Sequence, residues 1–355
     1  MKTNVLFRLS DMCYKGEKIS IKSSDNIELL AGQLLINRIL GVAYNNLNLS
    51  SLHPEIRKCF DSMNTNLKTK HEIFKCNLNY LTKILQDFPH NYALLKGAYL
   101  SSFIYEGGQR TSNDIDILIE DKNISQLQDL FKSHGFIQGR YDRISNTIIP
   151  ASRMQIIESR LNFGETIPLL KMIDGKPFEI DINFSVDYKP ELDGNLVSEL
   201  LSRKKVVTID GYNFNTLETV DFLIHLCCHL YKEATTYDWV LSRRDLLLYK
   251  FCDINVFVNK FATESFFINL LERIVEFGVE KECFYTFKNS SIIYPSLNDI
   301  EGFVSLKNAV KPLDLEFMSQ IIYPRERKIF SYDMSFTDWF FCSDRASQLS
   351  EVDNK

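Results

Sequence analysis

The chain has 355 residues, of which 45% are hydrophobic and 25% are charged, and its formal net charge is −5. This composition is typical of a globular protein with two or three substructures, and the negative charge argues against a broad nucleic-acid-binding surface. No apolar run reaches about 18 residues and no segment has the order of a signal peptide, so we expect a cytoplasmic protein outside the membrane. The eight cysteines form no CxxC pair, and we expect them to be reduced thiols.

The N-terminal part of the chain is predicted to be helical. Residues 26–59 contain the amphipathic run Ile27–Leu47, and the pattern over Ile56–Phe88 predicts one long helix between Pro54 and Pro89. An α/β segment follows, and helical patterns return after Leu217. These patterns predict three regions, which are an N-terminal helical region (1–90), an α/β core (91–190) and a mainly helical C-terminal region (191–355).

A lysine–glycine turn follows the first predicted strand. The short apolar run Tyr92–Leu95 ends at Lys96-Gly97, and residues 98–105 can then form a helix. Glycine allows backbone N–H groups at the start of a helix to approach a phosphate, which the helix dipole attracts. Lys96 and Arg110 would add positive charge there, although Arg110 could instead pair with a nearby aspartate.

Two aspartates lie on the next predicted strand, Asp114–Ile119. Asp114 and Asp116 alternate with apolar residues, so both carboxylates should leave the same face of the strand. Such a pair of oxygen ligands suits Mg²⁺, and the alternative is a solvated acidic face of a surface strand. The residues expected to face the core are Ile115, Ile117 and Ile119.

A hairpin is predicted over residues 166–184, after a helical stretch at 123–134 that ends at Gly135. Its turn is Asp174-Gly175, a strong turn signal between apolar runs. If the second arm neighbours the aspartate strand, a third carboxylate could complete a site for two divalent ions. Periodicity does not choose between Glu179 and Asp181 for this role.

These motifs resemble the DNA polymerase β-like nucleotidyltransferase superfamily. They are more closely similar to a poorly characterised bacterial nucleotidyltransferase family with the pattern KGaaL…Y…g.R…DiDlLv followed by vDlHw. The resemblance covers roughly residues 29–257 and favours Asp181 as the third acid. It implies an α/β (α+β) fold, with a mixed sheet and flanking helices as its nucleotidyltransferase core. The matching residues are Lys96-Gly97-Ala98-Tyr99-Leu100, Tyr105, Gly108, Arg110, Asp114–Ile119 and Ile180–Phe184.

The resemblance also implies a set of site residues and ligands. Asp114, Asp116 and Asp181 would be catalytic and would hold two Mg²⁺ ions, with Mn²⁺ as a substitute. ATP is the default nucleoside triphosphate, the acceptor is unidentified, and nucleic acid enters only as an acceptor substrate. The residues expected to bind the phosphates are Lys96, Gly97, Ala98, Ser101 and Arg110.

Two departures leave other functions open. Ala98 stands where many members of the superfamily have serine or glycine, and Asn183 stands where the closer family usually has histidine. Ser101 or Ser102 could supply the missing hydroxyl, or could simply face solvent. The alternatives are an inactive nucleotide-binding regulatory module, a toxin-like enzyme that modifies tRNA or protein, and a kinase-like γ-phosphoryl transfer.

Several other polar residues are expected to be structural. Asp221, His225 and His229 share one helix face, but the interval lacks the glutamate of HExxH, so we favour a structural or substrate-facing role over zinc binding. The cluster Ser242–Asp245 could reach phosphates, but a solvated helix face is the favoured expectation. Tyr99 could stack on a base, although a place in the helix–sheet interface is the simpler expectation, as it is for Tyr105.

Overall fold

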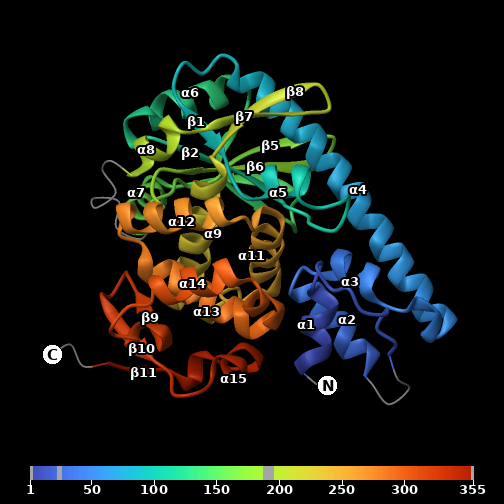
Figure 1. The fold of residues 1–355 in the computed structure, drawn as a ribbon. Coiled ribbons are helices and arrows are strands. Elements are labelled where there is room, and N and C mark those ends of the chain that lie inside the picture. The colour runs from blue at the N-terminus through green and yellow to red at the C-terminus, as the bar shows by residue number, and fades with distance from the viewer. Residues whose placement is uncertain (1–2, 22–25, 187–195, 353–355) are drawn as a thin grey trace. The chain divides into compact units, whose positions relative to one another are not determined.

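The computed structural model describes residues 3–21, 26–186 and 196–352 (Figure 1). The chain forms two compact units. One unit is Thr65–Phe222, and the other combines Met1–Asn64 with Leu223–Lys355. The mixed α/β class predicted from the sequence is confirmed.

A mixed sheet organises the unit Thr65–Phe222. Its described strands lie in the order β4-β3-β5-β6-β2-β1-β8-β7, in which the pairs β2–β6 and β1–β8 are parallel and the other pairs are antiparallel. The centre of the sheet is therefore β6-β2-β1. The strands are β1 (Tyr92–Leu94), β2 (Asp114–Ile119), β3 (Ile137–Asp142), β4 (Thr147–Pro150), β5 (Leu169–Ile173), β6 (Lys176–Asn183), β7 (Lys205–Ile209) and β8 (Tyr212–Thr216).

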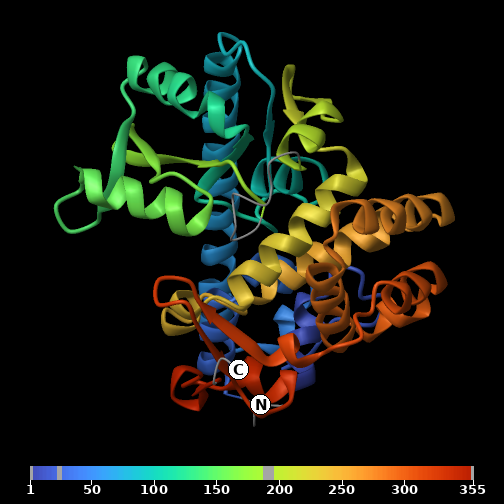
Figure 2. The same ribbon diagram turned by 90° about the vertical axis from the view of Figure 1, so that its left-hand side faces the viewer.

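Alternating apolar residues give this sheet its buried face. Ile115, Ile117 and Ile119 of β2 join Ile180 and Ile182 of β6 in one hydrophobic cluster, as predicted. Apolar residues of α4 and α6 complete the cluster, so these helices cover that face, and Figure 2 shows α4 running behind the strands. The helices of this unit, with α4 entering from the other unit, are α4 (Pro54–Leu85), α5 (Gly97–Phe103), α6 (Ile124–Ser133), α7 (Arg153–Phe163) and α8 (Leu196–Ser202).

The predicted hairpin is present with its predicted turn. Ile173 pairs with Lys176, and the two residues between them, Asp174 and Gly175, have φ values of 49° and 74°. A two-residue turn with both residues in the left-handed region matches the twist of antiparallel strands. This turn fixes the register of β6 and so decides which of its side chains face the core.

The N-terminal helices lie close to their predicted positions. The long helix α4 ends before Pro89, in agreement with the prediction. The run Ile27–Leu47 forms two helices rather than one, because the chain breaks at Arg38, whose φ is 54°. No described helix is long and apolar enough to cross a membrane.

The second unit is mainly helical, with a small sheet near the C-terminus. Its helices are α1 (Thr3–Ser10), α2 (Ile27–Ile36), α3 (Leu40–Asn46), α9 (Thr219–Ala234, which begins in the first unit), α10 (Tyr237–Leu241), α11 (Leu248–Phe261), α12 (Glu264–Phe277), α13 (Glu280–Ile293), α14 (Glu301–Ala309) and α15 (Phe336–Phe341). The small sheet has the order β11-β10-β9, with β9 (Gln320–Tyr323), β10 (Lys328–Ser331) and β11 (Ser350–Glu351).

The region after residue 190 contains more strand structure than the sequence indicated. β7 and β8 extend the large sheet, and β9–β11 follow α14. The predicted exposure of Ser242–Asp245 is correct for Ser242, Arg243 and Arg244 and wrong for Asp245. Asp245 is 1% exposed, and its carboxylate pairs with Arg345 at 2.6 Å. The partner lies 100 residues further along the chain, where no local pattern could indicate it.

Candidate active site

The turn after β1 brings Lys96 beside Asp116. The N–H group of Leu95 donates to the carbonyl of Asp116 at 3.0 Å, which continues the antiparallel pairing of β1 with β2 by one residue. Lys96 then adopts φ 39° and ψ −110°, a conformation that is strained for a residue with a side chain. Helix α5 begins at the next residue, Gly97. The expected strand, turn and helix are therefore present in the predicted order.

Gly97 is required by the close approach of Ser112. A Cβ atom on Gly97 would lie 2.5 Å from Ser112 Oγ and 2.6 Å from Ser112 Cβ, distances at which something must shift. Ser112 Oγ in turn donates a hydrogen bond to Asp114 Oδ1 at 3.0 Å. One serine thus links the glycine turn to the first aspartate of β2. Ser112 was not among the predicted site residues, because its approach to Gly97 depends on the path of the chain before β2.

The three predicted aspartates lie on adjacent parallel strands. Asp116 is directly opposite Asp181 in the β2–β6 register, and Asp114 is opposite Glu179. The predicted metal site required these two strands to be neighbours, and they are. The face that carries these acids is the one opposite the isoleucine face, so the carboxylates converge away from the hydrophobic cluster.

Lys96 supplies positive charge to this acidic group. Its Nζ donates to Asp116 Oδ1 at 2.7 Å, and only 16% of the lysine side chain and 7% of the aspartate side chain are exposed. Asn183 Nδ2 lies 3.5 Å from the same oxygen, at the outer limit of a hydrogen bond. The ammonium group is therefore the close partner of Asp116.

Asp181 is buried among like charges. Burial raises its pKa well above the ordinary value of 3.8, and the neighbouring carboxylates of Asp114 and Asp116 raise it further, followed by smaller effects of Glu179 and Glu165. Asp181 Oδ1 is buried and accepts no hydrogen bond from the described residues. A cation at this position would satisfy that oxygen and cancel the repulsion.

Glu165 is a further acid near the site that was not among the predicted residues. It follows α7, where Gly164 ends the helix in the left-handed conformation. Its backbone forms an isolated antiparallel β-bridge with Asn183 at the end of β6. Its negative charge is one of those that raise the pKa of Asp181. Sequence alone gave little signal for Glu165, because its place beside β6 depends on the path of the chain after α7.

The acids are chemically suited to bind a divalent cation. Carboxylate oxygens are the ligands that Mg²⁺ prefers, and the unsatisfied Asp181 Oδ1 fits that need. Among the described residues, however, no three His, Cys, Asp or Glu side chains are already arranged around one point that could hold an ion. A cation bound to Asp116 would share that carboxylate with the Lys96 ammonium group, which donates to its Oδ1.

The remaining predicted phosphate-binding residues support the loop between α5 and β2. Ser101 is 2% exposed and its Oγ donates to the carbonyl of Arg110 at 3.0 Å, so the alternative of a solvent-facing serine is wrong. Arg110 is 6% exposed and its Nη1 donates to the carbonyl of Thr111 at 2.6 Å. Ala98 is fully buried and its N–H donates to the carbonyl of Leu95. The structure brings these residues together around the turn but shows structural contacts for each.

The polar residues expected to be structural have structural partners. Arg203 Nε lies 2.9 Å from Asp221 Oδ2, and His229 Nε2 lies 3.3 Å from Glu233 Oε2. Tyr99 is 6% exposed and stacks on Phe103, with ring centroids 5.2 Å apart. Tyr99 therefore fills an interface, and its burial leaves little ring surface for a base.

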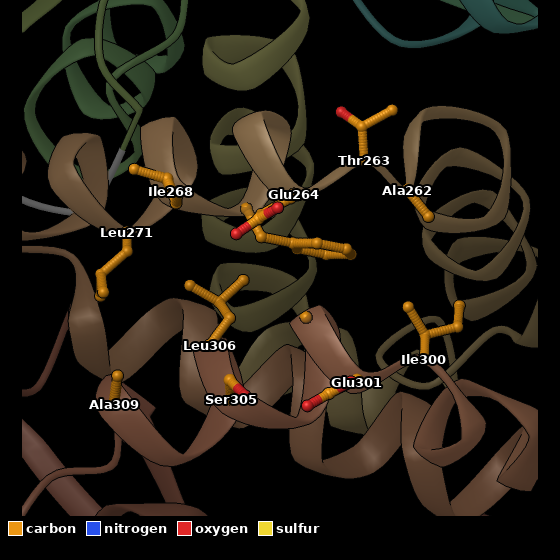
Figure 3. A pocket seen from close by; sticks show the side chains of 12 residues that line it. Ala262, Thr263, Glu264, Ile268, Leu271, Ile300, Glu301, Ser305, Leu306 and Ala309 are labelled. Carbon is orange, nitrogen blue, oxygen red and sulfur yellow. The ribbon is translucent and has the colours of Figure 1, made fainter.

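A separate cleft lies in the second unit, between α12 and α14 (Figure 3). It has a volume of about 630 Å³ and a mainly apolar lining, with Glu264 and Glu301 at the starts of the two helices. None of the predicted site residues lines it. The cleft is therefore distinct from the acidic group on the large sheet.

Comparison with known proteins agrees with the chemistry of that acidic group. Residues 23–295 match the model of a family described as an uncharacterised nucleotidyltransferase, a match over more than half of the chain. The chain belongs to this nucleotidyltransferase family. The matched range includes the acids of the large sheet, Asp114, Asp116, Glu165, Glu179 and Asp181, and the Lys96-Gly97 turn. No curated protein matches the chain.

Proposed function

We propose that the protein transfers a nucleoside monophosphate, by default AMP, from a nucleoside triphosphate to an acceptor hydroxyl and releases pyrophosphate. The observation that carries this proposal is the pairing of Asp116 with Asp181 across two parallel strands, directly beside the Lys96-Gly97 turn. The nucleotidyltransferase family match supports it. The likeness of the motifs to the DNA polymerase β-like superfamily supports a dependence of the reaction on Mg²⁺.

Different residues of the chain would bind the phosphates and the metal. Lys96 and the backbone at Gly97 would fix the triphosphate, because an ammonium group and the first turn of a helix both attract anions. Asp114, Asp116 and Asp181 would hold Mg²⁺, with Mn²⁺ as a substitute, and the bound metal would neutralise charge on the triphosphate. Ser112 would keep Asp114 beside the glycine turn through its hydrogen bond.

The chemical step is an in-line displacement at the α-phosphorus. The acceptor oxygen forms a bond to this phosphorus while the bond from phosphorus to the bridging oxygen of pyrophosphate breaks. The acceptor proton passes to Asp181, which lies opposite Asp116 on the neighbouring strand. Positioning and charge neutralisation supply most of the catalysis in this mechanism.

The test is transfer of label from each α-³²P-labelled nucleoside triphosphate, with Mg²⁺, to molecules of a cell extract. We expect label on a discrete acceptor and release of pyrophosphate, both lost in an Asp114→Ala/Asp116→Ala variant. Asp129→Ala is the matched control, because this aspartate of α6 lies in the same unit with a side chain that is 75% exposed. Full transfer by the double variant would exclude the assignment.

One competing function has a specific observation in its favour. The Lys96 ammonium group is paired with Asp116, and Ala98 provides no hydroxyl, both of which are compatible with an inactive nucleotide-binding regulatory module. Binding of the triphosphate without release of pyrophosphate would favour that module. Release of nucleoside diphosphate would indicate γ-phosphoryl transfer instead. Growth arrest on expression, relieved by Asp116→Ala, would indicate a toxin-like enzyme that modifies tRNA or protein.

A further inference from the structure

Lys96 is in direct contact with an acid of the candidate active site. Its Nζ is 2.7 Å from Asp116 Oδ1, and both side chains are largely buried. Asp181 is opposite Asp116. Asp114 and Glu179 form the facing pair two residues earlier on the same two strands. The ammonium group therefore lies at the point where the negative charge of the site is most concentrated.

The ammonium group and a divalent ion would compete for Asp116. Two positive groups on one carboxylate oxygen repel each other strongly where water is largely excluded. Lysine carries its charge on a flexible four-carbon stem, so it can leave the oxygen without a change in the backbone. The strained φ of 39° at Lys96 instead fixes the base of that stem at the edge of the Gly97 turn.

The alternative partner for Lys96 is a phosphate. Leu95 is hydrogen-bonded to Asp116, and α5 begins one residue after Lys96. The stem of the lysine therefore starts between the acids and the first turn of a helix, where an anion is favoured. A short swing of the side chain would move its charge from a carboxylate to a triphosphate.

We propose that Lys96 exchanges partners during binding, pairing with Asp116 in the ligand-free protein and with the triphosphate when metal and nucleotide are bound. This inference rests on the proposed nucleotidyl transfer. In the exchange no covalent bond changes, and one ion pair replaces another. The consequence is coupled binding. Metal alone must displace an ammonium group, whereas metal bound to a nucleotide brings the phosphates that receive it.

The test compares Lys96→Met with the wild-type protein in two binding measurements. The first follows Mn²⁺ alone by electron paramagnetic resonance, and the second follows an α,β-methylene analogue of ATP with Mn²⁺ by calorimetry. We expect Lys96→Met to bind Mn²⁺ alone about tenfold more tightly and the analogue about tenfold more weakly. A purely structural role for Lys96 would weaken both.

Two further variants serve as controls. Lys96→Arg keeps the positive charge and should bind Mn²⁺ alone as weakly as the wild-type protein. Lys204→Met removes a lysine of the same unit that donates to Asn91, away from the acids, and should change neither measurement. Thermal unfolding of each variant confirms that the folded protein is compared.

The outcomes separate this inference from the proposed function. If the wild-type protein binds both Mn²⁺ and the analogue, but Lys96→Met weakens or leaves unchanged the binding of Mn²⁺ alone, the exchange of partners is excluded and nucleotidyl transfer stands. If the wild-type protein binds neither ligand, the proposed function fails and this inference fails with it.

Discussion

Asp116 and Asp181 lie directly opposite each other on the neighbouring parallel strands β2 and β6. Adjacent strands are about 4.8 Å apart, so two carboxylates on the same face are close enough to repel strongly where they are buried. Asp116 is 5% exposed, and the pKa of Asp181 is raised by burial first and then by its acidic neighbours. These buried, mutually repelling carboxylates therefore lower the stability of the folded protein in the absence of a cation.

Asp181→Asn should stabilise the protein in the presence of a chelator, by about 1–3 kcal/mol at pH 8. The folded-state pKa of Asp181 lies above its unfolded value near 3.8. Between these two values the folded state binds more protons, so stability falls as the pH rises through that window. The gain from Asn should therefore be largest at pH 8 and should shrink towards pH 4. Thermal unfolding in EDTA at several pH values measures it.

Addition of Mg²⁺ should make the wild-type protein more stable than Asp181→Asn. A ligand that binds only the folded state raises the unfolding temperature, and the wild-type protein should gain more from Mg²⁺ than Asp181→Asn does. Asp129→Asn, at an exposed aspartate of α6, should respond to Mg²⁺ as the wild-type protein does. An equal rise for wild type and Asp181→Asn would show that Asp181 is not part of a metal site.

Gly97→Ala should destabilise the protein by about 1–3 kcal/mol and reduce nucleotidyl transfer. The added Cβ would meet Ser112 at 2.5–2.6 Å and would push away the residue that holds Asp114. Chemical denaturation and the labelling assay measure the two effects. Gly32→Ala is a matched control in α2, because a Cβ there meets nothing within 4 Å, and a helical alanine should stabilise slightly.

A second substitution tests whether the clash is the cause. Ser112→Gly removes both atoms that the new Cβ would meet, so Gly97→Ala/Ser112→Gly should recover much of the lost stability. It should not recover full transfer, because the hydrogen bond to Asp114 is also gone. A double variant as unstable as the sum of the single variants would show that the two residues are not coupled.

The sequence predicted the parts of the site that local patterns determine. Alternation of apolar and acidic residues indicated β2 and β6, and Asp174-Gly175 indicated the turn that sets the register of β6. The contacts of Ser112 and Glu165 were not predictable, since each depends on segments brought together by the fold. Ser101 illustrates the same limit, because its burial against the carbonyl of Arg110 follows from the path of the loop before β2.

Thr216→Val should destabilise the unit that carries the site by about 1–2 kcal/mol. Thr216 is fully buried at the end of β8, and its Oγ1 donates to the carbonyl of Leu94 at 2.8 Å, two residues before Lys96. Valine keeps the shape but leaves that carbonyl without this donor. Thr216→Ser keeps the hydroxyl and should preserve the pairing at lower cost. Hydrogen exchange at the β1 amides should quicken in Thr216→Val but not in Thr216→Ser.

Arg345→Met should destabilise the second unit by about 3–5 kcal/mol, because it leaves the carboxylate of Asp245 buried without its partner. Arg345 also donates to the carbonyls of Phe340 and Cys342. It therefore connects the segment around α15 to Asp245, which lies within the residues that match the family model. Denaturant unfolding at neutral pH measures the loss.

The loss from Arg345→Met should depend on pH in a defined direction. Burial already raises the pKa of Asp245, and Arg345 opposes that rise. Without the arginine the pKa rises further, so protonation of Asp245 relieves the buried charge as the pH falls, and the difference from wild type should shrink between pH 8 and pH 5. Asp245→Asn/Arg345→Met removes the charge itself and should therefore be more stable than Arg345→Met at pH 8. A loss that stays constant with pH would assign the role of Arg345 to its carbonyl contacts rather than to the ion pair.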